Sequence, residues 1–150
     1  MKTELTHPHS VIRKGQAQDL PLPSSVIRPP SSALRLVAWE LTRKCNLNCV
    51  HCRAGADRGP YPGELDTEKC FEILAQIQEV GNPIVILTGG EPLLREDIFD
   101  LAREGTRMGL RMVMATNGTL LTPEIIARMK TSGIQRLSIS IDGATAKQHD

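Results

Sequence analysis

The segment Cys45-Asn-Leu-Asn-Cys49-Val-His-Cys52 places three thiols within eight residues, at a C-x-x-x-C-x-x-C spacing. An extended residue advances roughly 3.3 to 3.6 Å, so these thiols converge only if the backbone curls around something. Thiolates are soft ligands that select iron–sulfur clusters, zinc or copper(I), and a 4Fe-4S cluster normally takes four ligands. Three cysteines would leave one iron open to a small molecule, which favours a cluster that takes part in chemistry.

Two other interpretations of the cysteines remain open. Cys3His is a normal zinc set, so a structural zinc ion could use the three cysteines with His51, although His51 directly precedes Cys52 and has little freedom to reach the same metal. A disulfide framework fits less well, because the clustered thiols are odd in number and residues 1–5 lack the apolar run of a signal peptide. We therefore expect a reducing, cytoplasmic environment.

Three further motifs follow the cysteines along the chain: Thr88-Gly-Gly-Glu-Pro92, Ala115-Thr-Asn-Gly118 and Ser140-Ile-Asp-Gly143. Together with the cysteine segment they resemble the motifs of the radical S-adenosylmethionine (SAM) enzymes, from about residue 34 to the end. The resemblance implies two cofactors, a 4Fe-4S cluster on Cys45, Cys49 and Cys52, and SAM. It also implies that the reduced cluster cleaves SAM to a 5′-deoxyadenosyl radical, while the protein orients the reactants and excludes water.

The resemblance also implies a set of SAM-binding residues. Gly89 and Gly90 would let the backbone approach the ligand, and the Glu91 carboxylate would accept a hydrogen bond from the methionyl amino group of SAM. Asn117 would contact the ribose or the carboxylate, and His51 would stack on the adenine ring. The complete expected set is His51, Gly89, Gly90, Glu91, Asn117, Ser140 and Asp142.

Longer phrases of the sequence, such as residues 83–97 and 110–118, are similar to the tetrapyrrole-modifying branch of this family. They most resemble the heme b synthases, which decarboxylate two propionates of iron-coproporphyrin III. This implies an iron tetrapyrrole as substrate, an electron donor such as ferredoxin or flavodoxin, and Arg53 and Arg58 as candidate partners of the propionates. The alternatives are a peptide-maturing radical SAM enzyme and, in a different class, a non-catalytic zinc-binding module.

The composition excludes several other classes of function. The chain has 150 residues, a net charge of +1 and 3% aromatic residues. Base-stacking platforms for nucleic acid are therefore absent, and no apolar run approaches the length of a membrane span. Five prolines interrupt residues 1–32, which we expect to form a flexible tail in which His7 and His9 have no role, and residues 33–150 are expected to form one domain.

The fold class expected from residue 34 onward is α/β with parallel strands. Short apolar runs at residues 34–40, 84–87, 111–115 and 136–141 alternate with amphipathic helices, which is typical of a parallel sheet. The family resemblance implies the N-terminal half of a partial (βα)6 TIM-like barrel. We expect the barrel to be truncated after the fourth strand and the chain to be inactive by itself. All four motifs follow strand ends, where ligands gather in such folds.

Three helices carry recognisable boundaries. Asp66 and Thr122 are predicted N-caps, Gly81 and Gly133 follow predicted helix ends, and the middle helix is expected from about Asp97 to Met108. Cys70 is expected to be a small buried hydrophobe. The inward-facing residues are predicted to be Phe71, Leu74 and Ile77; Ile98, Leu101 and Ala102; and Ile125, Ile126 and Met129.

The fourth strand alternates between apolar and polar residues. Leu137, Ile139 and Ile141 occupy one face, while Ser138, Ser140 and Asp142 occupy the other. A strand covered on both faces normally reads as a continuous apolar run. The polar row therefore predicts an open, ligand-holding cavity, or alternatively an edge strand whose polar face meets solvent.

Overall fold

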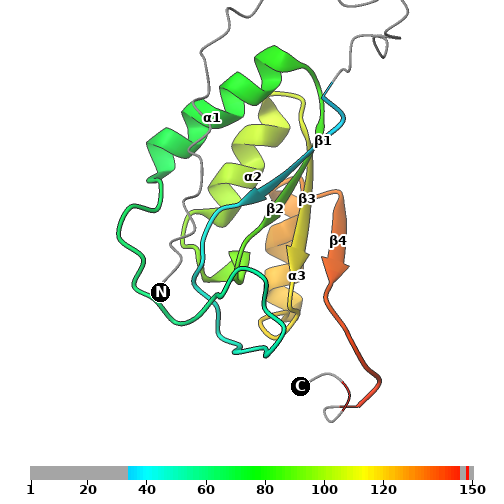
Figure 1. Ribbon diagram of the computed structural model, residues 1–150. Helices are drawn as coiled ribbons and strands as arrows, with labels where there is room; N and C mark the ends of the chain where they lie inside the picture. The colour runs from blue at the N-terminus through cyan, green and yellow to red at the C-terminus, as the bar shows by residue number, and fades with distance from the viewer. Residues whose placement is uncertain (1–33, 146–147, 149–150) are drawn as a thin grey trace, which may run out of the picture. The chain divides into compact units, whose positions relative to one another are not determined.

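The computed structural model describes residues 34–145 and 148 (Figure 1). The predicted tail over residues 1–32, with His7 and His9, lies outside the described residues. From residue 34 the chain alternates strands and helices, as the sequence predicts.

A four-stranded parallel sheet forms the framework. Its strands are β1 (Leu36–Glu40), β2 (Ile84–Thr88), β3 (Arg111–Thr116) and β4 (Arg136–Ile139), and they lie in the order β1-β2-β3-β4. Each strand pairs in parallel with its neighbour, as in the pairs Glu40 with Thr88 and Thr116 with Ile139. The expected α/β class with parallel strands is therefore confirmed.

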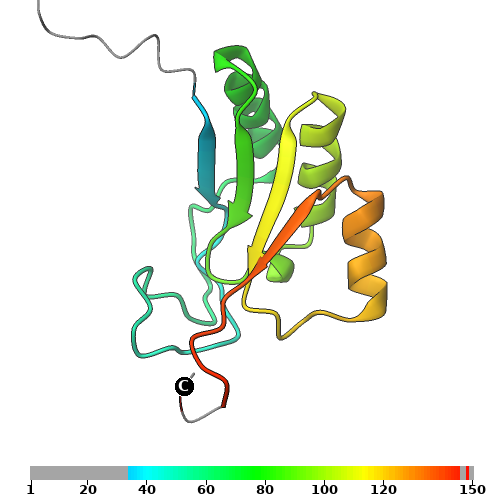
Figure 2. The same cartoon turned by 90° about the vertical axis from the view of Figure 1, so that its right-hand side faces the viewer.

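Three helices cover one face of this sheet (Figure 2). They are α1 (Thr67–Val80), α2 (Ile98–Arg107) and α3 (Pro123–Thr131), and a short 3-10 helix, η1 (Pro92–Leu94), follows β2. The Asp66 carboxylate accepts a hydrogen bond from the Lys69 N–H at 2.8 Å, and the Thr122 hydroxyl accepts one from the Ile125 N–H at 3.3 Å, so both predicted caps are confirmed.

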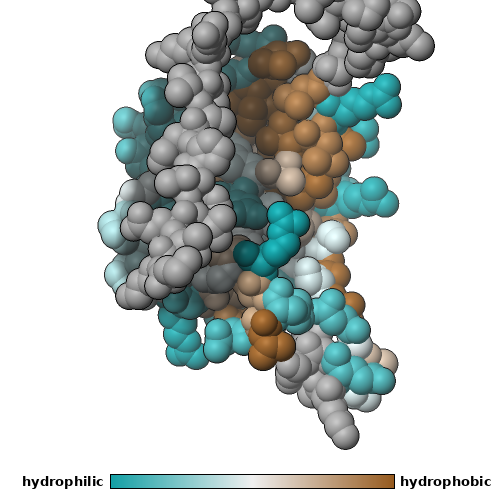
Figure 3. All heavy atoms as spheres, in the orientation of Figure 1, coloured by the Kyte–Doolittle hydropathy of each residue, from teal (hydrophilic) through white to brown (hydrophobic). Residues whose placement is uncertain are grey.

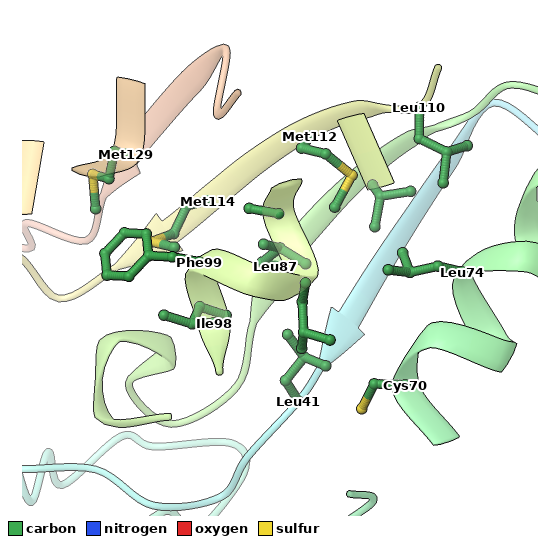
Figure 4. Close-up of a cluster of buried hydrophobic side chains, with 13 residues drawn as sticks. Leu41, Cys70, Leu74, Leu87, Ile98, Phe99, Leu110, Met112, Met114 and Met129 are labelled. Atoms are coloured by element: carbon green, nitrogen blue, oxygen red, sulfur yellow. The ribbon is translucent and has the colours of Figure 1, made fainter. Parts of the chain in front are cut away.

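The core lies between the helices and the sheet (Figure 4). Fully buried side chains come from α1, α2, β2 and β3, and Met129 adds a contact from α3. Ile126 differs from the prediction, because 42% of its surface is exposed. Ile125 and Met129 share one stripe of α3 at i,i+4 spacing, and Ile126 lies one position further around the helix.

β4 is shorter than predicted and ends at Ile139. Only Leu137 of the apolar row packs against the core, whereas Ile139 is 42% and Ile141 70% exposed. β4 pairs only with β3 among the described strands and so forms an edge. Ser138 is exposed, as expected for an edge strand. Ser140 and Asp142, which follow β4, line a cavity, as expected from the other interpretation.

The other face of the sheet carries no helix in the described part of the chain. Side chains of alternate strand residues form an apolar surface there, and Figure 3 shows hydrophobic side chains along this side of the strands. The surface comprises Leu36, Ile84, Ile86, Val113 and Ala115. None of the described helices is long and apolar enough to cross a bilayer.

Candidate functional site

A cavity lies at the carboxyl ends of the strands and brings the four sequence motifs together. Nine of the ten residues predicted for the cluster and SAM sites line it, and the exception is Glu91. The lining residues are Cys45, Leu47, Cys49, His51, Cys52, Ala56, Thr88, Gly89, Gly90, Ala115, Thr116, Asn117, Ser140 and Asp142. Residues that are distant in the sequence therefore meet where parallel strands end, as expected for such a fold.

The cysteine loop curls back on itself. Cys45 is buried, Cys49 and Cys52 are half-buried, and all are free thiols. The Cys45 N–H donates to the Asp57 carbonyl at 2.6 Å and closes the loop, while the Cys52 N–H donates to the Cys49 carbonyl at 3.1 Å. Two backbone donors already point at sulfur, since Leu47 N lies 3.4 Å from Cys45 Sγ and Ala56 N lies 3.4 Å from Cys52 Sγ.

A clamp formed by Arg43, Asp57 and Tyr61 holds the base of this loop. The Arg43 guanidinium donates to the Ala54 carbonyl at 3.3 Å and lies 4.9 Å from the centroid of the Tyr61 ring. The Tyr61 hydroxyl donates to the Asp57 carboxylate and accepts from the Asp57 N–H at 3.0 Å. The hydrogen bond from Tyr61, followed by one from the Gly59 N–H, lowers the pKa of Asp57.

Gly89 and Gly90 lie against the backbone that leads into the cysteine loop. The Gly90 N–H donates to the Thr42 carbonyl at 2.7 Å, and the Glu91 N–H donates to the Lys44 carbonyl at 2.8 Å. A Cβ on Gly89 would lie 2.2 Å from the Thr42 carbonyl oxygen, and one on Gly90 would lie 2.5 Å from that of Lys44. The glycines therefore permit a close approach to the protein's own backbone as well as lining the cavity.

Glu91 makes several hydrogen bonds within the protein. Its carboxylate is fully buried and accepts from the Thr116 hydroxyl at 2.8 and 2.9 Å, from the Asn117 N–H at 2.8 Å and from the Leu93 N–H at 3.0 Å. These donors occupy both oxygens, and Glu91 does not line the cavity. In the structure Glu91 therefore joins the loop after β2 to the end of β3, and its contact with SAM stays a prediction.

Asn117 joins the end of β3 to the cysteine loop. Its amide nitrogen donates to Asn46 Oδ1 at 2.9 Å and lies 3.8 Å from Cys45 Sγ. Its amide oxygen accepts from the Thr119 N–H at 2.9 Å and from the Thr119 hydroxyl at 2.7 Å. Asn46 was missed by sequence reasoning, although its position directly after Cys45 was a usable signal.

His51 and Asp142 face each other at the mouth of the cavity. His51 Nε2 lies 3.1 Å from Asp142 Oδ2, and both side chains are more than half exposed. The Ser140 N–H donates to the Thr116 carbonyl at 3.0 Å, which keeps the chain after β4 aligned with β3. Arg53 and Arg58, the candidate partners of substrate propionates, are exposed and do not line this cavity.

Arg95, which sequence reasoning also missed, ties three segments together outside the cavity. Its guanidinium pairs with the Asp97 carboxylate through two contacts of 2.7 Å and donates to the carbonyls of Leu41 and Leu65 at 3.0 Å. Asp97 also accepts from the Thr67 hydroxyl at 2.7 Å and makes no side-chain cap on α2. Cys70 beside this group is fully buried, and burial raises the pKa of its thiol.

The chemistry of the donors fits a 4Fe-4S cluster. The three thiols of the loop line one cavity with N–H donors directed at two of their sulfurs. Within the described residues, no group of three His, Cys, Asp or Glu side chains converges on a single metal ion. A 4Fe-4S cluster does not need such convergence, because each cysteine binds a different iron.

The chain is similar in sequence to known proteins. The family model described as the radical SAM superfamily matches residues 39–150. The chain is 55% identical over 120 residues to the AdoMet-dependent heme synthase of Methanosarcina barkeri, covering 80% of this chain and 34% of that protein. It is 38% identical over 114 residues to the mycofactocin maturase MftC of Mycobacterium ulcerans, covering 76% of this chain and 31% of that protein.

A solved structure is similar in fold. BtrN in complex with AdoMet and 2-DOIA superimposes with a TM-score of 0.59 at 24% identity, over 78% of this chain and 48% of that chain. The chain spans about a third of the length of the curated relatives it matches.

Proposed function

The chain belongs to the radical SAM superfamily, and on that premise we propose that Cys45, Cys49 and Cys52 hold a 4Fe-4S cluster at which SAM is cleaved. Members of this superfamily bind such a cluster together with SAM. The observation that supports the proposal is the shared cavity, in which the three thiols lie beside the Gly89-Gly90 turn and the ends of β3 and β4.

Each group of residues has a distinct part in this proposal. The three thiolates would hold the cluster and would leave one iron open to the amino and carboxylate groups of SAM. The bound cluster supplies the electron that breaks a carbon–sulfur bond of SAM. Ser140 and Asp142 offer oxygen acceptors to ribose hydroxyls, and the His51 ring, held beside Asp142, offers a face for adenine.

The substrate proposed is an iron tetrapyrrole whose propionates are oxidatively decarboxylated. The 55% identity to a heme synthase supports this choice. Conversion of a propionate to a vinyl group removes hydrogen from an unactivated carbon, which side-chain acids and bases do not achieve near neutral pH but a carbon radical does. Turnover also requires a one-electron donor, and ferredoxin and flavodoxin are the candidates.

Peptide maturation is the second candidate function. It is favoured by the 38% identity to a mycofactocin maturase, because that protein shares the same part of the chain. The two functions differ in substrate and share the cluster and SAM chemistry, so a test of cofactor binding and a test of substrate are needed separately.

The test of cofactor binding is anaerobic reconstitution of this chain, followed by counts of iron and sulfide. We expect about four irons for the wild type and for Cys70→Ala, because Cys70 lies in the core away from the loop. Cys52→Ala should lose the complete cluster. A Cys52→Ala chain that keeps four irons, or a wild type that binds one zinc in place of iron, would overturn the proposal.

The test of substrate uses a protein of the relatives' full length that carries this sequence. It is incubated under argon with SAM, a reductant and iron-coproporphyrin III, and products are identified by mass. Loss of carbon dioxide from two propionates is the expected result. If 5′-deoxyadenosine forms while the porphyrin stays intact, the substrate assignment fails and a peptide substrate becomes the next candidate.

A further inference from the structure

The side chain of Asn117 reaches a sulfur of the proposed cluster site. Its amide nitrogen lies 3.8 Å from Cys45 Sγ, within range of an N–H···S hydrogen bond. We propose that Asn117 donates this hydrogen bond to the Cys45 thiolate and thereby raises the reduction potential of the cluster. The inference rests on the proposed function, since it requires a cluster at Cys45.

The orientation of the Asn117 amide is fixed by its neighbours. The two ends of an amide are easily exchanged in a structure, so the hydrogen-bond partners must decide which end is nitrogen. The Thr119 backbone N–H can only donate, and it lies 2.9 Å from the end assigned as oxygen. The opposite end is therefore the NH2 group, and this is the end that faces Cys45 and Asn46.

Both donors of this NH2 group have partners. An amide NH2 carries two N–H bonds; one meets Asn46 Oδ1 at 2.9 Å, and the second faces the Cys45 sulfur. The Asn46 amide in turn donates to the Thr119 hydroxyl at 2.7 Å, which closes a ring of three side chains. Hydrogen bonds at both the oxygen and the nitrogen therefore fix the orientation of the Asn117 side-chain amide.

The backbone of Asn117 is fixed as well. Its N–H donates at 2.8 Å to the buried carboxylate of Glu91. The loop after β2 therefore fixes the backbone of Asn117. The side-chain N–H of Asn117 is in turn placed beside the sulfur of Cys45. Glu91 therefore contacts the site through this backbone hydrogen bond, and it is not among the residues that line the cavity.

A donor at this sulfur favours the reduced form of a cluster. Reduction adds a negative charge that is partly carried by the sulfur ligands, and hydrogen bonds to these sulfurs are among the factors that set the potential. Cys45 is buried, with 8% of its surface exposed, so water competes weakly with the amide. Its other donor, the Leu47 N–H at 3.4 Å, belongs to the backbone and stays in any Asn117 variant.

The test is a redox titration of the reconstituted protein without SAM, followed by electron paramagnetic resonance. Asn117→Ala should lower the ratio of reduced to oxidised cluster about tenfold at a given potential. For a one-electron couple this is a fall of about 59 mV in the reduction potential. Asn117→Asp should lower it further, because it replaces the donor by a negative charge. Asn48→Ala, an exposed asparagine of the same loop, should leave the potential unchanged.

The outcomes separate the two proposals. A wild type that binds no cluster overturns the proposed function, whereas equal potentials for wild type and Asn117→Ala with full clusters overturn only the present inference. If the variants lose the cluster, selective 15N labelling of asparagine in the unaltered protein decides the question. A hyperfine coupling from a side-chain amide nitrogen supports the hydrogen bond, and its absence overturns it.

Discussion

The hydroxyl of Thr116 lies 2.8 and 2.9 Å from the two carboxylate oxygens of Glu91, and both residues are buried. Thr116 is the last residue of β3, and Glu91 directly precedes η1 after β2. A single carboxylate thus joins the ends of neighbouring strands beneath the cavity. All four hydrogen-bond contacts of this carboxylate use its oxygens as acceptors, so replacing one oxygen by a nitrogen should disturb them.

Glu91→Gln should therefore destabilise the fold. The amide nitrogen of glutamine would face donors in place of one acceptor oxygen, at a cost of about 2 to 3 kcal/mol in the free energy of unfolding. Urea denaturation of the chain measures this cost. Glu96→Gln, at an exposed position nearby, is the control and should change stability by less than about 0.5 kcal/mol. A stable Glu91→Gln chain that has lost only SAM affinity would instead support the direct contact with SAM that the motif predicts.

Gly90→Ala should reduce cluster loading as well as SAM binding. The added Cβ would meet the Lys44 carbonyl oxygen at 2.5 Å and that of Arg43 at 2.8 Å, so the segment before Cys45 must move. We expect a loss of about 1 to 3 kcal/mol of stability and less iron per chain after reconstitution.

The matched control for this glycine is Gly109→Ala. Gly109 has a φ of +85° and no atom within 4 Å of an added Cβ. Its replacement should cost about 1 to 2 kcal/mol through backbone strain while leaving the iron content unchanged. Full iron content in Gly90→Ala with weakened SAM binding would show that Gly90 meets the ligand only.

Tyr61→Phe should speed the loss of iron from a loaded cluster. The change removes the hydroxyl that donates to the Asp57 carboxylate, whereas the ring beneath Arg43 remains. Without this hydrogen bond the loop is held less firmly, so iron should be released to a chelator faster than from the wild type. Tyr61→Ala also loses the ring and should release iron faster still. Equal release rates for wild type and both variants would mean that the clamp does not retain the loop.

The Arg95–Asp97 pair should make stability depend on pH in the acid range. Burial by itself would raise the pKa of Asp97, but hydrogen bonds from Arg95 and Thr67 outweigh burial and the pKa lies below its usual value. A carboxyl whose pKa is lowered by folding stabilises the fold above its unfolded pKa of about 3.9, and this contribution is lost as pH falls through the folded pKa.

The measurement is urea denaturation of wild type and Asp97→Asn between about pH 7 and pH 2. The variant should be about 2 to 3 kcal/mol less stable than wild type near pH 7, because Arg95 loses its charged partner while 11% exposed. The difference in the free energy of unfolding between wild type and Asp97→Asn should become smaller as the pH falls. Asp100→Asn, in an exposed surface pair, should show neither effect. If the difference in the free energy of unfolding between wild type and Asp97→Asn stays constant across this pH range, the charge of Asp97 is not its source.

Much of this architecture is predictable from the sequence because it depends on local signals. The caps at Asp66 and Thr122 are short-range hydrogen bonds, and β2, β3 and β4 begin where the predicted apolar runs begin. The positions that could not be predicted depend on contacts between distant segments. The contacts of Glu91 with Thr116 and Asn117 join segments that lie 25 and 26 residues apart, and the exposure of Ile126 depends on how α3 packs.

The strands lie in the sheet in the same order as in the chain, so each strand pairs with the one made just before it. Apart from the pair of His51 with Asp142, the contacts described for the cysteine loop come from residues 42 to 119: the glycine turn, Glu91, Asn117 and the Arg43 clamp. During synthesis, the chain therefore holds these partners of the loop once residue 119 has left the ribosome, and only Asp142, the partner of His51, is still to come. The residues that make these contacts are translated soon after the loop and before β4. The loop can therefore form these contacts before β4 is made.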